Sequence, residues 1–154
     1  MNKLACCFLV SILAAGFHIN LHAEADVEYY RSDLFKQKNL PLSDVVRVDN
    51  LLFVSGNLGI DFSTENLALV PGGITAETRQ TLKNIDRTLK NYGSSLDKVV
   101  KCTLFLADID EWPAVNKVWR EFFKQRYPAR TAVQAGRLWH DAAIEIECIA
   151  ATGK

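Results

Sequence analysis

Two segments with helical periodicity interrupt a series of short strand-like runs, and this alternation most constrains the fold. The first segment begins near Thr75, where a capping side chain is available, and stops at Gly93. The second can be capped by Asp108 or Asp110 and has Pro113 in its first turn. Each carries an apolar stripe that predicts a helix with one buried face. The stripes are Leu82, Ile85, Leu89 and Tyr92 in the first, and Val115, Val118, Trp119, Phe122 and Phe123 in the second.

Strand-like runs lie on both sides of these helices. Residues 45–48 and 51–56 are apolar runs separated by Asp49 and Asn50, which tolerate positive φ, so they predict a β-hairpin. A third apolar run, at residues 99–106, lies between the helices and predicts a buried strand.

Two further strand-like runs close the chain, at residues 130–138 and 143–151. We expect them to form a hairpin that turns near His140. Arg130 and Glu145 would then lie about five residues apart, on the order of 17 Å. They could not touch within one chain, so a site using both would need water and ligand, strand twist or a neighbouring subunit.

The predicted order is β-β-(β)-α-β-α-β-β, with the optional strand near residues 67–70. Two helices on one face of a mostly antiparallel sheet form an α+β two-layer sandwich. Several strand residues predicted on the second face of the sheet are apolar, so this face also has to be shielded from water. A homo-oligomer would bury it. These residues are Val46, Val48, Phe53 and Leu104.

The first 23 residues have the pattern of a secretory signal peptide. Lys3 precedes an apolar run over residues 4–17, and the small Ala23 stands before acidic residues. An uncleaved anchor is the alternative, but the run is short for a bilayer that needs about 20 apolar residues. We expect a periplasmic or secreted protein with no membrane attachment after cleavage. Residues 24–40 would form an N-terminal arm or a short edge element, and 41–154 the folded domain.

Charge and cysteine content limit the ligands and the metal sites that we expect for this chain. Eighteen basic residues balance eighteen acidic ones, which gives no electrostatic basis for binding nucleic acid. Cys102 and Cys148 remain after the leader and could oxidise in an exported protein. Both lie in apolar runs, where a free cysteine acts as a small buried hydrophobe, so we favour free thiols. With His140 they lack metal-ligand spacing, so we expect no metal site.

Two charged residues, Arg130 and Glu145, interrupt the apolar sequences of the last two predicted strands. A charge in a strand is costly unless it is paired or solvated. Both could simply lie on a solvated sheet edge. Alternatively, a planar guanidinium suits bidentate binding of a small carboxylate, and a carboxylate can position water as a general base.

Two stretches resemble the signature of the RidA family of reactive imine deaminases. They are Tyr-Pro-Ala-Arg-Thr-Ala-Val at residues 127–133 and Ile-Glu-Ile-Glu-Cys-Ile-Ala at 144–150, and the similarity extends over nearly all of 41–151. The resemblance implies a chorismate-mutase-like subunit that forms a homotrimer with ligand clefts between subunits. It also implies hydrolysis of small 2-imino or enamino acids, such as 2-aminoacrylate, to 2-keto acids and ammonia without a cofactor.

The resemblance also implies roles for individual residues. Arg130 would bind the substrate carboxylate and Glu145 would hold the hydrolytic water. Ser55 and Gly56 match the loop beside the ligand, and Asn116 matches a residue that lines the cleft from the helix side.

The chain departs from the family pattern at three positions. Leu42 replaces a tyrosine whose hydroxyl faces the ligand, and Asn57 replaces a glutamine. Ala132 stands where cysteine is common, at a position that contributes its backbone carbonyl. Two functions from other classes remain open, namely a noncatalytic trimer that binds small carboxylates and a stress-activated holdase. The nuclease activity ascribed to some members is disfavoured by the neutral charge.

Overall fold

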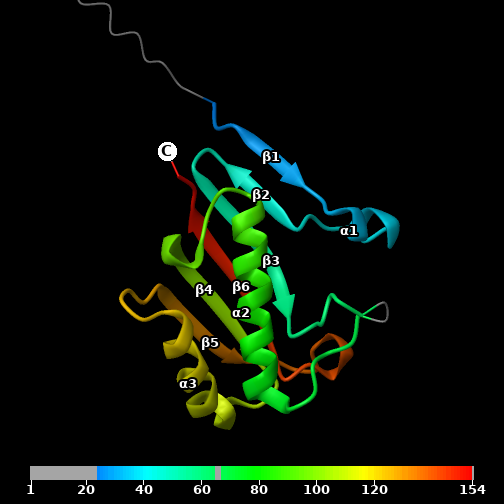
Figure 1. Cartoon of the computed structure of the whole chain (residues 1–154), viewed down its shortest axis with the longest axis vertical. Coiled ribbons are helices and arrows are strands. Elements are labelled where there is room, and N and C mark those ends of the chain that lie inside the picture. The colour runs from blue at the N-terminus through cyan, green and yellow to red at the C-terminus, as the bar shows by residue number, and fades with distance from the viewer. Residues whose placement is uncertain (1–23, 65–66, 154) are drawn as a thin grey trace, which may run out of the picture.

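A six-stranded sheet forms one layer of the molecule, and helices α2 and α3 form the other (Figure 1). The computed structural model describes residues 24–64 and 67–153, so the predicted leader at 1–23 lies outside the described residues. The strands are β1 (Val27–Tyr30), β2 (Val45–Val48), β3 (Leu51–Leu58), β4 (Val99–Leu106), β5 (Ala129–Gln134) and β6 (Ile144–Ala151). The helices are α1 (Asp33–Gln37), α2 (Gly73–Asn91) and α3 (Trp112–Phe122), with short 3-10 turns at Leu96–Lys98, Ile109–Glu111 and Trp139–Asp141. This arrangement confirms the predicted α+β sandwich with two helices on one face.

The strand order is β1-β2-β3-β6-β4-β5, and among the described strands only the β4–β5 pair is parallel. The predicted hairpin between the last two strands is therefore wrong. In Figure 1 the red β6 lies between β3 and β4, and β5 lies at the edge of the sheet. The burial of the residues explains why β6 lies inside the sheet and β5 at its edge. Ile144, Ile146 and Cys148 are apolar and buried on one face of β6, whereas most residues of β5 are exposed, which suits an edge strand.

The predicted hairpin between β2 and β3 is confirmed. Val48 pairs with Leu51 across a two-residue turn, in which Asp49 has a φ of 50°. The polar segment at residues 24–40 contains an edge strand, since β1 pairs antiparallel with β2 at the end of the sheet. The optional strand near residues 67–70 reduces to a single bridge between Ile60 and Leu69.

The helix starts differ slightly from the predicted ones. Helix α2 starts at Gly73 and is preceded by Gly72, whose φ of 115° turns the chain without a side-chain cap, so Thr75 does not cap this helix. Asp108 caps the 3-10 turn before α3 by accepting a 2.9 Å hydrogen bond from the main-chain nitrogen of Asp110. Pro113 lies in the first turn of α3, as predicted.

The core lies between the sheet and the two long helices. We call the sheet face that packs against α2 and α3 the core face; it carries Leu52, Leu104 and Ile146, all fully buried. The opposite face, called here the open face, carries Phe53 and Val133, which are 40% and 41% exposed. The prediction that Leu104 lies on the open face is wrong. Leu104 pairs with Ile146 across β4 and β6, so both point into the core.

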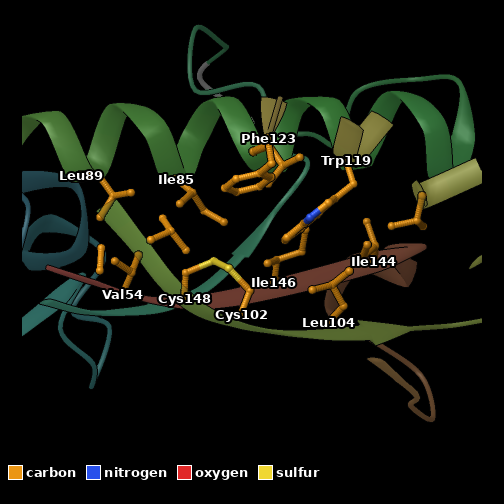
Figure 2. Close-up of a cluster of buried hydrophobic side chains, with 14 of the residues drawn as sticks. Val54, Ile85, Leu89, Cys102, Leu104, Trp119, Phe123, Ile144, Ile146 and Cys148 are labelled. Atoms are coloured by element: carbon orange, nitrogen blue, oxygen red, sulfur yellow. A yellow bond between two sulfur atoms is a disulfide. The ribbon is translucent and has the colours of Figure 1, made fainter. Parts of the chain in front are cut away.

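A disulfide joins the neighbouring strands β4 and β6, which corrects the prediction of free thiols. Cys102 on β4 and Cys148 on β6 are directly opposite each other in the antiparallel ladder, and they form a disulfide. Figure 2 shows it within the core, in the neighbourhood of Ile85 and Val54. Apolar surroundings alone favoured free cysteines, but the strand register decides the pairing because it brings the two side chains to the same point of one sheet face.

The disulfide predicts a redox-dependent stability. It closes a loop of 46 residues, so reduction should lower the free energy of unfolding by about 2–4 kcal/mol. Urea unfolding with and without a reductant measures this difference. A double variant, Cys102→Ala with Cys148→Ala, is the control and should unfold at the same urea concentration in both conditions. An equal midpoint for the native protein with and without reductant would show that the strands are not cross-linked.

Candidate functional site

Arg130 lies on β5 and points toward α3. Its Nη2 donates a 2.6 Å hydrogen bond to Oδ1 of Asn116. Its guanidinium carbon is 4.4 Å from the ring centre of Trp112 and 4.8 Å from that of Trp119. Cation–π contacts of this kind hold a guanidinium in place without neutralising it. The helix stripe identified Trp119 only as a core residue, and no sequence signal pointed to Trp112.

A pocket of about 230 Å³ opens beside this arginine. Its lining residues come from α3 and from the segment that enters β5, and they are Asn116, Trp119, Arg120, Tyr127, Pro128 and Arg130. Burial lowers the pKa of Arg130, and the nearby Arg120 lowers it further, but a guanidinium remains protonated in proteins. Nη1 of Arg130 is buried and has no acceptor in the described part of the chain. The group therefore retains hydrogen-bonding capacity for an anion.

Glu145 lies near the start of β6, with Phe105 of β4 and Leu58 of β3 as its neighbours across the sheet. Its carboxylate covers Gly56, since a Cβ atom there would overlap Oε1 and would lie 2.9 Å from the carboxyl carbon. Only glycine leaves room for this approach. Burial raises the pKa of Glu145, and the negative charge of Glu147 raises it further.

Ser55 and Gly56 lie where the β3–β6 register shifts, between Val54 and Asn57. The hydroxyl of Ser55 donates a 2.6 Å hydrogen bond to the main-chain oxygen of Ser43. The segment that contains Leu42 is thus tied to the strand beside Glu145. Leu42 itself is 44% exposed, so it offers an apolar surface at the position where the family resemblance implies a tyrosine.

Arg130 and Glu145 lie on opposite faces of the sheet. Arg130 pairs with Cys102, which points into the core, whereas Glu145 pairs with Phe105, three residues further along the same strand. Side chains alternate between faces along a strand, so an odd separation places the two groups on different sides. Two strand spacings and three residues along the strand put their Cα atoms about 14 Å apart.

The predicted site residues therefore form two groups within one chain. The arginine half-site consists of Arg130, Asn116 and the two tryptophans, and Ala132 lies two residues along β5 on the same core face. The glutamate half-site consists of Glu145, Ser55 and Gly56. Across residues 24–64 and 67–153, no three His, Cys, Asp or Glu side chains are grouped to hold a metal ion. None of the helices in these ranges combines the length and the apolar composition that a membrane span requires.

Comparison with known proteins identifies the family. A family model described as endoribonuclease L-PSP matches residues 36–152. The solved structure of RidA from the Antarctic bacterium Psychrobacter sp. is similar to this chain with a TM-score of 0.68 and 34% identity, covering 72% of this chain and 88% of that one. The chain belongs to the RidA family.

Relatives of this RidA-family chain have names that state an activity. The 2-iminobutanoate/2-iminopropanoate deaminase of Capra hircus is 42% identical over 113 residues, which cover 73% of this chain and 81% of the goat protein. The human protein of the same name is 41% identical over 113 residues, with the same coverage of both chains. At the level of the family, these names support imine deamination.

The raised pKa of Glu145 predicts how stability changes with pH. Below the ordinary value of 4.5 the carboxyl is protonated in both the folded and the unfolded chain. As the pH rises through the higher pKa of the folded state, the partly buried group must ionise, so the folded chain loses stability relative to Glu145→Gln. Urea unfolding of both proteins from about pH 4 to about pH 8 measures the difference.

The same change at the exposed Glu24 is a matched control for the substitution itself. A difference between the native protein and Glu145→Gln that stays constant, or that favours the native protein as pH rises, would contradict the assigned environment of Glu145.

Proposed function

We propose that this chain is an imine and enamine deaminase that hydrolyses small 2-imino acids to 2-keto acids and ammonia, without a cofactor. The observation that carries the proposal is the guanidinium of Arg130. It is held by Asn116 and two tryptophan rings at the wall of a pocket, and its charge is not neutralised by a carboxylate in the described residues. The names of relatives about 42% identical support the same reaction.

The reaction requires a bound carboxylate and a directed water. Arg130 binds the substrate carboxylate through paired N–H groups, which fixes the imine carbon. Glu145 accepts a proton from a water molecule whose oxygen adds to that carbon. Glu145 returns that proton to nitrogen, which gives the neutral carbinolamine. Glu145 then takes the proton of the new hydroxyl group and passes it to nitrogen, so ammonia leaves as the C–N bond breaks and the C=O bond forms. A pKa above the ordinary range brings this carboxylate closer to the operating pH, which favours these transfers.

We propose that the complete site forms between copies of the chain, in a homotrimer. The two half-sites face opposite sides of one sheet, so a single chain cannot bring them to one substrate. A heterologous interface would place the β5 edge of one copy against the open face of the next. Phe53 and Val133 support this placement, because they leave apolar surface on the open face.

We also propose that the protein works in the periplasm or outside the cell. The leader pattern of residues 1–23 supports export. The disulfide between Cys102 and Cys148 gives a second, independent argument, because disulfides persist mainly in oxidising compartments.

Two substitutions test the reaction. When 2-iminobutanoate is generated in situ with an amino-acid oxidase and catalase, Arg130→Ala should lower kcat/KM for ammonia release about 100-fold through loss of the charged contacts. Glu145→Gln should lower kcat about 100- to 10,000-fold through loss of the general base. The binding of 2-oxobutanoate, measured by calorimetry, should be lost in Arg130→Ala and retained in Glu145→Gln.

Arg126→Ala is the matched control, because it removes an exposed guanidinium close in sequence that does not line the pocket. It should behave like the native protein. Ammonia release at the spontaneous rate by all four proteins would refute a deaminase with this substrate. Retained carboxylate binding together with the spontaneous rate would instead favour a noncatalytic carboxylate-binding trimer.

A further inference from the structure

A second guanidinium lines the pocket beside Arg130. Arg120, in the last turn of α3, donates a 3.3 Å hydrogen bond from Nη1 to the main-chain oxygen of Asn116. Arg130 donates to the side-chain oxygen of the same asparagine. The two cations therefore converge on Asn116 from different elements, at the wall of one pocket.

Neither guanidinium forms an ion pair within the described residues. Residues 116–130 contain five cationic side chains and a single acid, Glu121. That acid is occupied elsewhere, since it forms a bidentate ion pair with Arg79 of α2. The lining of the pocket thus contains two cationic side chains and no acidic one, in a chain whose basic and acidic residues balance.

Placing two like charges at one pocket has a cost that a ligand can remove. Arg120 and Arg130 repel each other: burial is the main cause of the lowered pKa of Arg130, and the charge of Arg120 lowers it further. One carboxylate is enough for the guanidinium of Arg130, because a bidentate pair uses both oxygens. A second anionic group would be needed to satisfy Arg120. The position of Arg120 near the end of α3 favours a cation there through the helix dipole, but this does not require the side chain to line the pocket.

We propose that the preferred substrates are 2-imino dicarboxylic acids, in which Arg130 binds the carboxylate next to the imine and Arg120 binds the distal carboxylate. This inference rests on the proposed deaminase function and specifies its substrate class. The pocket volume of about 230 Å³ is below the roughly 300–1,000 Å³ typical for drug-sized ligands, which suits a small diacid. Water adds to the imine carbon and ammonia leaves as before, so the distal carboxylate contributes binding and orientation only.

Selectivity is the quantity to measure. Amino-acid oxidases with catalase generate 2-iminoglutarate from glutamate and 2-iminobutanoate from 2-aminobutyrate, and ammonia release by the native assembly gives kcat/KM for each. The ratio of dicarboxylic to monocarboxylic kcat/KM should exceed one and should fall about tenfold or more in Arg120→Gln, because a charge-assisted contact is lost. The control is Lys117→Gln, which removes an exposed positive charge from the same helix outside the pocket and should leave the ratio unchanged.

An unchanged ratio in Arg120→Gln, or an equal fall in Lys117→Gln, would overturn the proposal. If neither imine is hydrolysed, the proposed deaminase function is wrong. The two-carboxylate site is then tested only by calorimetric measurement of keto-acid binding. Binding of 2-oxoglutarate that is at least tenfold weaker in Arg120→Gln, with 2-oxobutanoate affected less, would still support a two-carboxylate site. Equal binding of 2-oxoglutarate and 2-oxobutanoate by the native protein and by Arg120→Gln would overturn the two-carboxylate site. Binding of a single-stranded RNA through Arg120, with no binding of either acid, would also overturn it.

Discussion

The pairing of β6 with β3 on one side and with β4 on the other determines the arrangement of the rest of the molecule. It buries Ile144 and Ile146 beneath the helices and sends the alternate residue, Glu145, to the open face. The disulfide between Cys102 and Cys148 holds this register at its centre. A shift by one residue would turn the carboxylate into the apolar core and the isoleucines outward, at a large free-energy cost, so the same packing that stabilises the fold also positions Glu145.

The chemistry that this fold supports is divided between two faces. Arg130 is held on the core side by Asn116 and two tryptophans, and Glu145 covers Gly56 on the open side. Each half-site is preorganised by neighbours within its own chain. Neither contains both Arg130 and Glu145, and we therefore propose that the reaction takes place in an assembly of copies rather than in one chain.

Local sequence patterns predicted much of the fold and of the candidate site. The predictions that were wrong depend on the pairing of strands that are distant in the sequence. The helical stripes, the hairpin at Asp49 and the resemblance at Arg130 and Glu145 depend on residues close in the sequence, so they could be recognised directly. Strand order could not, because neighbouring strands usually pair and nothing local shows that β6 leaves β5 to lie between β3 and β4. The disulfide and the core position of Leu104 follow from that order. The contact of Trp112 with Arg130 depends on how α3 packs beside β5, which a single helix stripe does not show.

The most direct test of a site shared between copies uses two variants that are each inactive. Subunits with Arg130→Ala and subunits with Glu145→Gln are mixed at equal amounts, allowed to assemble, and isolated as mixed oligomers through two different tags. If one copy supplies the arginine and the next supplies the glutamate, the isolated mixed trimers should recover about one third of the native imine hydrolysis, because one of the three sites in each mixed trimer contains both intact residues. Activity no greater than that of the two variants assayed separately would contradict the account.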